Sequence, residues 1–92
     1  MFIQELEKNN IHIKQAILFG SYASGRYNDW SDIDIALVSD SFTGHRFFDR
    51  NKLRTIKLAI SSAIEPLPFT PNEFNSDNPF VKRILDTGLR LI

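Results

Sequence analysis

The sequence predicts one small α/β (or α+β) domain, spanning residues 1–92, with helices packed on a small mixed β-sheet. Short apolar runs bounded by turn-forming residues alternate along the chain with stretches whose apolar residues recur every three or four positions. This alternation is typical of strands and helices packed in layers. The 92 residues, 42% of them hydrophobic, suffice for one modest core. No repeat or long linker divides the chain, so we expect a single domain.

Composition excludes several classes of function. The formal net charge is zero, so there is no overall electrostatic attraction to nucleic acid or to a membrane surface. Cysteine is absent, which excludes disulfides and thiolate chemistry. Charged residues interrupt the N-terminal apolar stretch, and no apolar run is long enough to cross a bilayer. We therefore expect a cytoplasmic protein without a signal peptide, and a nucleic-acid partner is not expected.

The first half of the chain is expected to form a helix and two strands. Apolar residues at helical spacing predict a short first helix that stops at Asn9-Asn10. The apolar run at 16–19 predicts a buried strand ending at Gly20. Residues 21–24 can open a short helix, and the polar stretch 25–31 predicts a loop. The alternation that follows predicts a second strand over about 32–38.

The second half is expected to form two helices and two more extended segments. A helix over about 47–63 would turn one apolar stripe toward the sheet; its members are Leu53, Ile56, Ile60 and Ala63 or Ile64. The prolines within 64–69 predict an extended segment that is confined to a sheet edge. Residues 70–73 resemble a helix cap. A last helix over 79–87 would end at Gly88, and 89–92 can add a brief strand.

Two acids in the second strand are the first candidate for chemistry. Asp32 and Asp34 alternate with apolar residues, so both carboxylates are expected on one face, with Cα atoms roughly 7 Å apart. Oxygen ligands at that separation can converge on one hard cation such as Mg²⁺. The alternative is an ordinary solvent-exposed strand face that carries two acids.

The turn after the first strand favours the chemical interpretation. Gly20 allows a sharp turn and a close approach to the backbone. The hydroxyl of Ser21 and the free N–H groups of a following helix would suit an anion. An anion-binding turn followed by paired acids is what magnesium-dependent phosphoryl or nucleotidyl transfer needs.

These motifs resemble a known superfamily. Phe19-Gly20-Ser21, then ten residues, then Asp32-Ile33-Asp34-Ile35 is similar to the signature of the DNA polymerase beta-like nucleotidyltransferases. Within this superfamily, the motifs look more narrowly like those of the minimal nucleotidyltransferases of bacteria and archaea. This resemblance implies the nucleotidyltransferase fold. It also implies that Gly20, Ser21 and Ser31 bind a nucleoside triphosphate, and that Asp32 and Asp34 hold Mg²⁺. Members often carry arginine where Tyr22 or Ser24 stands here.

The resemblance also implies a third carboxylate. Family members place one at the start of the strand after the long helix, and Glu65 stands there, although aspartate is the usual residue. Glu65 would complete the metal site and accept the proton of an attacking hydroxyl. The alternatives are an exposed edge-strand glutamate and the weaker competitor Glu73. On the loop before the acids, Trp30 either packs on the core, which we favour, or stacks on a base.

The expected function is transfer of a nucleoside monophosphate, AMP from ATP, onto a hydroxyl. Minimal nucleotidyltransferases are often paired with HEPN-domain proteins as toxin–antitoxin systems, so the resemblance implies a helical HEPN-type partner and an antitoxin role. The alternatives are a noncatalytic partner-binding antitoxin and a nucleotide-sensing module. A partner interface is expected on aromatic residues at 42, 47 and 48 and on a basic row, although a merely solvated face is the favoured interpretation of that row; it comprises Arg46, Arg50, Arg54 and Lys57.

Overall fold

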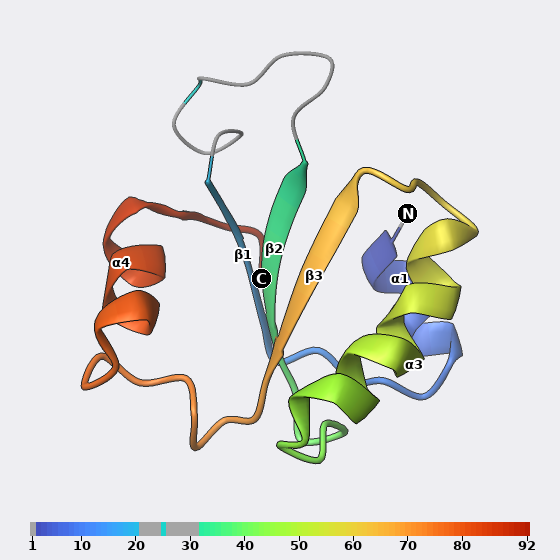
Figure 1. The fold of residues 1–92 in the computed structure, drawn as a ribbon, viewed down its shortest axis with the longest axis horizontal. Helices are drawn as coiled ribbons and strands as arrows, with labels where there is room; N and C mark the ends of the chain where they lie inside the picture. The colour runs from blue at the N-terminus through green and yellow to red at the C-terminus, as the bar shows by residue number, and fades with distance from the viewer. Residues whose placement is uncertain (1, 21–24, 26–31) are drawn as a thin grey trace.

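A computed structural model describes residues 2–20, 25 and 32–92, and Figure 1 shows their arrangement. The expectations for the short helix at 21–24 and for Ser21, Trp30 and Ser31 lie outside these described residues. The elements, in chain order, are α1 (Phe2–Lys8), β1 (Gln15–Phe19), β2 (Ile33–Val38), α3 (Arg46–Leu58), β3 (Ile64–Phe69), α4 (Pro79–Thr87) and β4 (Leu89–Arg90).

The strands form the small mixed sheet that the sequence predicts. Its order is β3-β2-β1-β4, with β1 antiparallel to both β2 and β4, and β2 parallel to β3. The N–H of Ile33 donates to the Ala63 carbonyl and that of Ser39 to the Phe69 carbonyl. In a parallel ladder alternate residues face the neighbouring strand, so the intervening Pro66 and Pro68 turn their missing N–H groups toward the free edge. The edge position expected for 64–69 is thus confirmed.

Helices cover both faces of the sheet. Figure 1 shows α1 and α3 on one face and α4 on the other. Strand alternation in β2 supplies both cores: Ile35 and Leu37 join the cluster under α1 and α3, whereas Ala36 and Val38 join the cluster under α4. Buried partners on the α1 and α3 side include Phe2, Leu6, Ile11, Phe42 and Leu53. Those on the α4 side include Ile17, Phe69, Val81 and Ile84.

Helix α3 is shorter than its apolar pattern predicts. It ends at Leu58, with Ala59 as the C-cap, instead of continuing to residue 63. Ile60, expected to face the sheet, is 40% exposed, so that prediction is wrong. The physical reason is the connection: Ile64 must already pair with Ile33 in the parallel ladder, and the chain needs the intervening residues to turn back.

Of the two helix starts predicted after β3, one begins a helix and the other only a turn. Pro79 begins α4, the side chain of Asn78 accepts from the Phe80 N–H at 2.9 Å, and Gly88 is the C-cap. This confirms the last helix. Thr70 and Glu73 exchange two hydrogen bonds of the capping-box type, yet they close only a turn. The helix cap predicted there is therefore wrong, because no helix follows it.

A buried aspartate holds the loop between β2 and α3. Asp49, in the first turn of α3, is only 2% exposed. Its carboxylate accepts hydrogen bonds from the N–H and hydroxyl of Thr43 and from the N–H of Gly44, at 3.0–3.2 Å. The sequence gives no signal for this role, because an acid in the first helical turn is ordinarily exposed. The contact fixes where α3 begins relative to the sheet.

Replacing Asp49 with alanine is expected to lower the free energy of unfolding by about 1–3 kcal/mol, because several hydrogen bonds to a buried charge are lost. Urea unfolding measures this change. The matched control is Lys52→Ala, an exposed position on the same helix, which should change stability by less than about 0.5 kcal/mol. Equal effects of the two substitutions would show that the Asp49 contacts do not stabilise the fold.

Candidate active site

Three strands bring the predicted catalytic acids to one end of the sheet. β1 is antiparallel to β2, so the end of β1 lies beside the beginning of β2, and the parallel β3 begins there too. The register places Asp34 opposite Phe19 on one side and opposite Glu65 on the other. Asp32 lies just before β2 and is exposed.

On the sheet face that α4 covers, the acidic side chains follow directly after a row of apolar ones. Asp34 shares a strand face with Ala36, and Glu65 shares one with Leu67, by the alternation of side chains. Ala36 and Leu67 belong to or pack against the α4 cluster. The ring of Phe19 packs edge-to-face on that of Phe80, with centroids 6.1 Å apart. The same sheet face is thus apolar under α4 and acidic beyond it, which leaves Asp34 half-buried beside an apolar wall.

Burial and like charge both act on Asp34. Partial desolvation, followed by the negative charges of Asp32 and Glu65, raises the pKa of the Asp34 carboxyl above its usual value. Carboxylates that share a site without a counter-charge disfavour their own ionisation. The arrangement is one that a bound cation would stabilise.

Gly20 adjoins Asp34 directly. Its φ is +74°, and a Cβ atom built on it would overlap Oδ2 of Asp34 and lie 3.4 Å from Cγ. Glycine is therefore needed both for the left-handed backbone and for the space that the carboxylate occupies. The sequence predicts a close approach to this glycine by phosphate; the structure shows a close approach by the Asp34 carboxylate. The nucleotide contact of Gly20 stays a prediction.

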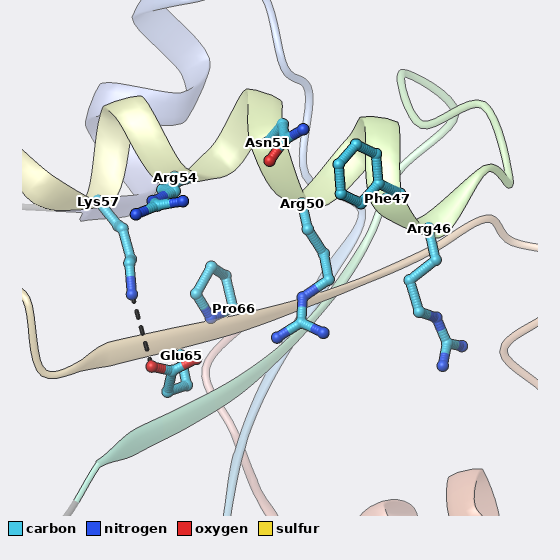
Figure 2. Close-up of a pocket in the computed structure, with 8 residues that line it drawn as sticks. All are labelled: Arg46, Phe47, Arg50, Asn51, Arg54, Lys57, Glu65 and Pro66. Carbon is cyan, nitrogen blue, oxygen red and sulfur yellow. Dashed lines mark ion pairs between the residues drawn. The ribbon is translucent and has the colours of Figure 1, made fainter.

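Glu65 has a partner that the sequence does not reveal. Lys57 Nζ, on a side chain that is 13% exposed, lies 3.5 Å from Glu65 Oε1. Lys57 is on α3, and its side chain reaches the edge strand, as the dashed line in Figure 2 shows. No spacing rule predicts this pair, because the contact depends on how α3 crosses β3.

The oxygen atoms of these acids are suitable ligands for a hard cation, but the three side chains are not arranged around one metal position. All three candidate ligands offer carboxylate oxygens, which Mg²⁺ prefers. Within residues 2–20, 25 and 32–92, no group of three or more His, Asp or Glu side chains is placed to hold a metal ion. Glu65 is engaged with Lys57 instead. A metal would accordingly be held by Asp32 and Asp34, with Glu65 joining once its side chain leaves Lys57.

The basic row of α3 lines a cavity of about 570 Å³ that also reaches Glu65. Figure 2 shows its side chains extending from α3 toward β3; the lining includes Arg46, Arg50, Arg54, Lys57, Glu65 and Pro66. The sequence favours a plain solvated face for this row. The three arginines are exposed, but they share a concavity that adjoins the candidate catalytic acid.

One aromatic residue of the expected interface is misplaced. Phe47 and Phe48 are 73% and 56% exposed, as an interface requires. Phe42 is only 5% exposed and belongs to the core under α1 and α3. Its expected place in an interface is therefore wrong, because the loop after β2 folds this ring inward onto Leu53 and its neighbours.

None of the helices among the described residues has the length and apolar character needed to cross a membrane.

Comparison with known proteins finds a relative by sequence, similar solved structures and a matching family. A protein of Methanocaldococcus jannaschii, named as a candidate protein adenylyltransferase, is 64% identical over 28 residues; the matched segment spans 30% of this chain and 28% of that relative. A crystal structure from Sulfolobus solfataricus, described as a candidate nucleotidyltransferase, has a TM-score of 0.64 at 23% identity, over 97% of this chain and 71% of the other.

A second crystal structure, described as a toxin-antitoxin with AMP-PNP, has a TM-score of 0.63 at 25% identity. The match covers 98% of this chain and 68% of the other. These likenesses confirm the mixed α+β fold expected from the resemblance. The family described as Polymerase beta, Nucleotidyltransferase matches residues 2–92. The chain belongs to this nucleotidyltransferase family.

Proposed function

We propose that this domain transfers AMP from ATP to a hydroxyl group of a partner protein. The observation that carries the proposal is the group of acids beside Gly20, where Asp34 is half-buried and feels the charges of Asp32 and Glu65. Acids gathered at a strand end can hold Mg²⁺, whose positive charge stabilises the negative charge that develops during phosphoryl transfer. The name of the M. jannaschii relative, a candidate protein adenylyltransferase, supports a protein acceptor.

In the proposed reaction, the acceptor oxygen attacks the α-phosphorus of ATP. A bond forms between that oxygen and the α-phosphorus, and the bond from the α-phosphorus to the bridging oxygen of the β-phosphate breaks. Pyrophosphate leaves with that bond's electron pair. The hydroxyl proton passes to the Glu65 carboxylate, which acts as general base. Gly20, Ser21 and Ser31 bind the triphosphate and hold it in line with the acceptor.

The proposed cofactor is Mg²⁺, held by Asp32 and Asp34 with Glu65 as a third ligand. When bound, it supplies positive charge that stabilises the attacking and leaving oxygens. Asp32 and Asp34 would hold this ion, and its positive charge would bind and orient the α-phosphate. Because Lys57 contacts Glu65 at 3.5 Å, Lys57 has to release Glu65 for it to serve as ligand or base.

The proposed partner is a HEPN-type helical protein, with the domain acting as the antitoxin of the pair. The solved relative described as a toxin-antitoxin with AMP-PNP supports both a nucleotide and a partner. That relative also keeps open a noncatalytic antitoxin, which would bind its partner without modifying it. A nucleotide sensor without turnover is a third candidate. Only the first of the three attaches AMP covalently to a partner; the second binds the partner without modifying it, and the third binds nucleotide without turnover.

Glu65→Gln is expected to slow AMP transfer to the partner by about 10²–10⁴-fold, the usual contribution of a general base, and to change partner binding much less than transfer. Mass spectrometry of the partner after incubation with ATP and Mg²⁺ measures the added AMP. The matched control is Glu73→Gln, since Glu73 is exposed and its side chain is hydrogen-bonded only to Thr70 within the described residues; it should transfer at the parent rate.

Three other results would each overturn a part of this proposal. Complex formation with no AMP transfer by the parent would identify a binding antitoxin. Equal losses in Glu65→Gln and Glu73→Gln would show that Glu65 is not the general base. AMP transfer to a small hydroxylated molecule without any partner would contradict the protein acceptor.

A further inference from the structure

A concave basic surface runs from the candidate catalytic site along one edge of the sheet. We define the α3 groove as the cavity of about 570 Å³ between α3 and β3. Four cations of α3 line it against one carboxylate, Glu65, and Lys57 already pairs with that carboxylate. Arg46, Arg50 and Arg54 make no ion pair within the described residues. The groove thus has positive charge without a matching anion.

The cations are arranged as an extended row. Arg46 and Lys57 are eleven positions apart on one helix, so the row is about 16 Å long at 1.5 Å per residue. Figure 2 shows the side chains of Arg46 and Arg50 pointing off the helix toward β3. The guanidinium carbon of Arg46 lies 5.9 Å from the centre of the Phe69 ring, which holds one end of the row in place. Lys57 marks the other end, beside Glu65.

The edge strand itself limits how a ligand can bind here. Pro66 lines the groove and lacks the N–H that an added strand would need, as does Pro68. The two prolines therefore disfavour the addition of a peptide strand at this edge of the sheet. Recognition has to come from side chains, and arginine is the cation best suited to bidentate contact with carboxylates.

We propose that the α3 groove binds an acidic segment of the acceptor protein and so selects hydroxyls that are flanked by acidic residues. The groove ends at Glu65, so a chain lying in it leads its hydroxyl to the proposed general base. At about 3.3 Å per extended residue, the row of cations matches roughly five residues on one side of that hydroxyl. This assignment of the acceptor rests on the proposed transfer reaction.

An acidic peptide fits the observations better than a nucleic acid does. The whole chain has no net charge, and nucleic-acid binding usually relies on a broad excess of positive charge. Here the excess of positive charge is confined to one face of α3. It lies beside the exposed Phe47, which also lines the groove. A short acidic peptide needs only this local charge.

The test measures peptide binding without nucleotide, by fluorescence anisotropy. The probes are two labelled peptides with a tyrosine followed or preceded by glutamates, and control peptides with glutamines in their place. One glutamate peptide is expected to bind at least about tenfold more tightly than its glutamine control at low salt, and salt should weaken it. Arg50→Glu and Arg54→Glu should each weaken binding by about tenfold or more.

The matched control is Lys52→Glu, which reverses an exposed charge on α3 outside the groove. It should alter binding by less than about twofold. Equal binding of glutamate and glutamine peptides would overturn the proposal, as would equal losses in Lys52→Glu and Arg50→Glu. Displacement of the peptide by a single-stranded oligonucleotide that binds more tightly, and through the same arginines, would assign the groove to nucleic acid instead.

Adding ATP and Mg²⁺ to the same samples separates this proposal from the proposed function. Transfer of AMP to the glutamate peptide's tyrosine, but not to the control's, supports both. If the parent binds the peptide through these arginines but transfers no AMP, the groove would still be a site for acidic peptides, and the proposed reaction would be contradicted. Transfer to both peptides at equal rates would support the reaction and overturn the selection of acidic segments.

Discussion

The Asp34→Asn variant is expected to slow nucleotidyl transfer by about 10²–10³-fold while remaining folded. Asp34 is the most constrained of the three acids: it adjoins Gly20, pairs in register with Glu65 and feels the charge of Asp32. Removal of one preorganised charged group from a phosphoryl-transfer site typically costs factors of this size. Asparagine preserves the shape of the side chain, so the strand pairing should be kept.

The same variant is expected to change how stability depends on pH. The pKa of Asp34 is raised in the folded state above its usual value of 3.8, so the folded state binds this proton more tightly than the unfolded state does. The contribution of Asp34 to the free energy of unfolding is therefore fully present below pH 3.8 and is lost as pH rises through the higher folded-state pKa. Asparagine removes this loss, so at neutral pH without metal the variant should be as stable as the parent or more stable.

Thermal unfolding with and without Mg²⁺ measures the metal part of this prediction. Mg²⁺ is expected to stabilise the parent and not Asp34→Asn, because ligand binding to the folded state raises its stability. The matched control is Asp40→Asn, which removes an exposed acid after the other end of β2, paired with Lys14 at 2.8 Å. It should retain transfer and the response to Mg²⁺. If Mg²⁺ stabilised Asp34→Asn as much as the parent, the metal would not be bound by Asp34.

Gly20→Ala is expected to slow transfer by about a hundredfold or more and to destabilise the domain by more than the backbone conformation alone predicts. An alanine at a φ of +74° costs about 1–2 kcal/mol. In addition its Cβ overlaps Oδ2 of Asp34, so either the carboxylate or the turn has to move. Displacement of a catalytic group by about 1 Å is enough to cost about two orders of magnitude in rate.

Gly44→Ala separates these two effects. Gly44 also has a positive φ, +86°, but among the described residues its Cβ would meet only Thr70 Cγ2 at 3.7 Å, so this variant reports the backbone cost without a collision. It should transfer normally. Urea unfolding of Gly20→Ala, Asp34→Ala and the double variant gives the coupling energy between the two positions. Additive losses in this cycle would show that Gly20 does not make room for Asp34.

The sequence by itself determined the mixed α+β architecture and the neighbouring positions of the main acids. Local periodicity predicted β1, β2, β3 and the helix at 79–87, because apolar alternation and caps act within a few residues. The prolines at 66 and 68 predicted the edge position of their strand, since a missing N–H is tolerated only there. The place of Glu65 beside the paired acids was implied by the family resemblance alone, and the parallel pairing of β2 and β3 sets it opposite Asp34; its chemical role stays a prediction.

Only the tertiary structure decided the contacts that depend on how α3 crosses the sheet. The end of α3 at Leu58 follows from the return into β3, and the burial of Phe42 follows from how the preceding loop folds. The pairing of Lys57 with Glu65, and the cavity that the basic row lines, require side chains from two elements to meet. Such meetings are set by packing geometry and not by spacing along the chain, so local patterns carry no record of them.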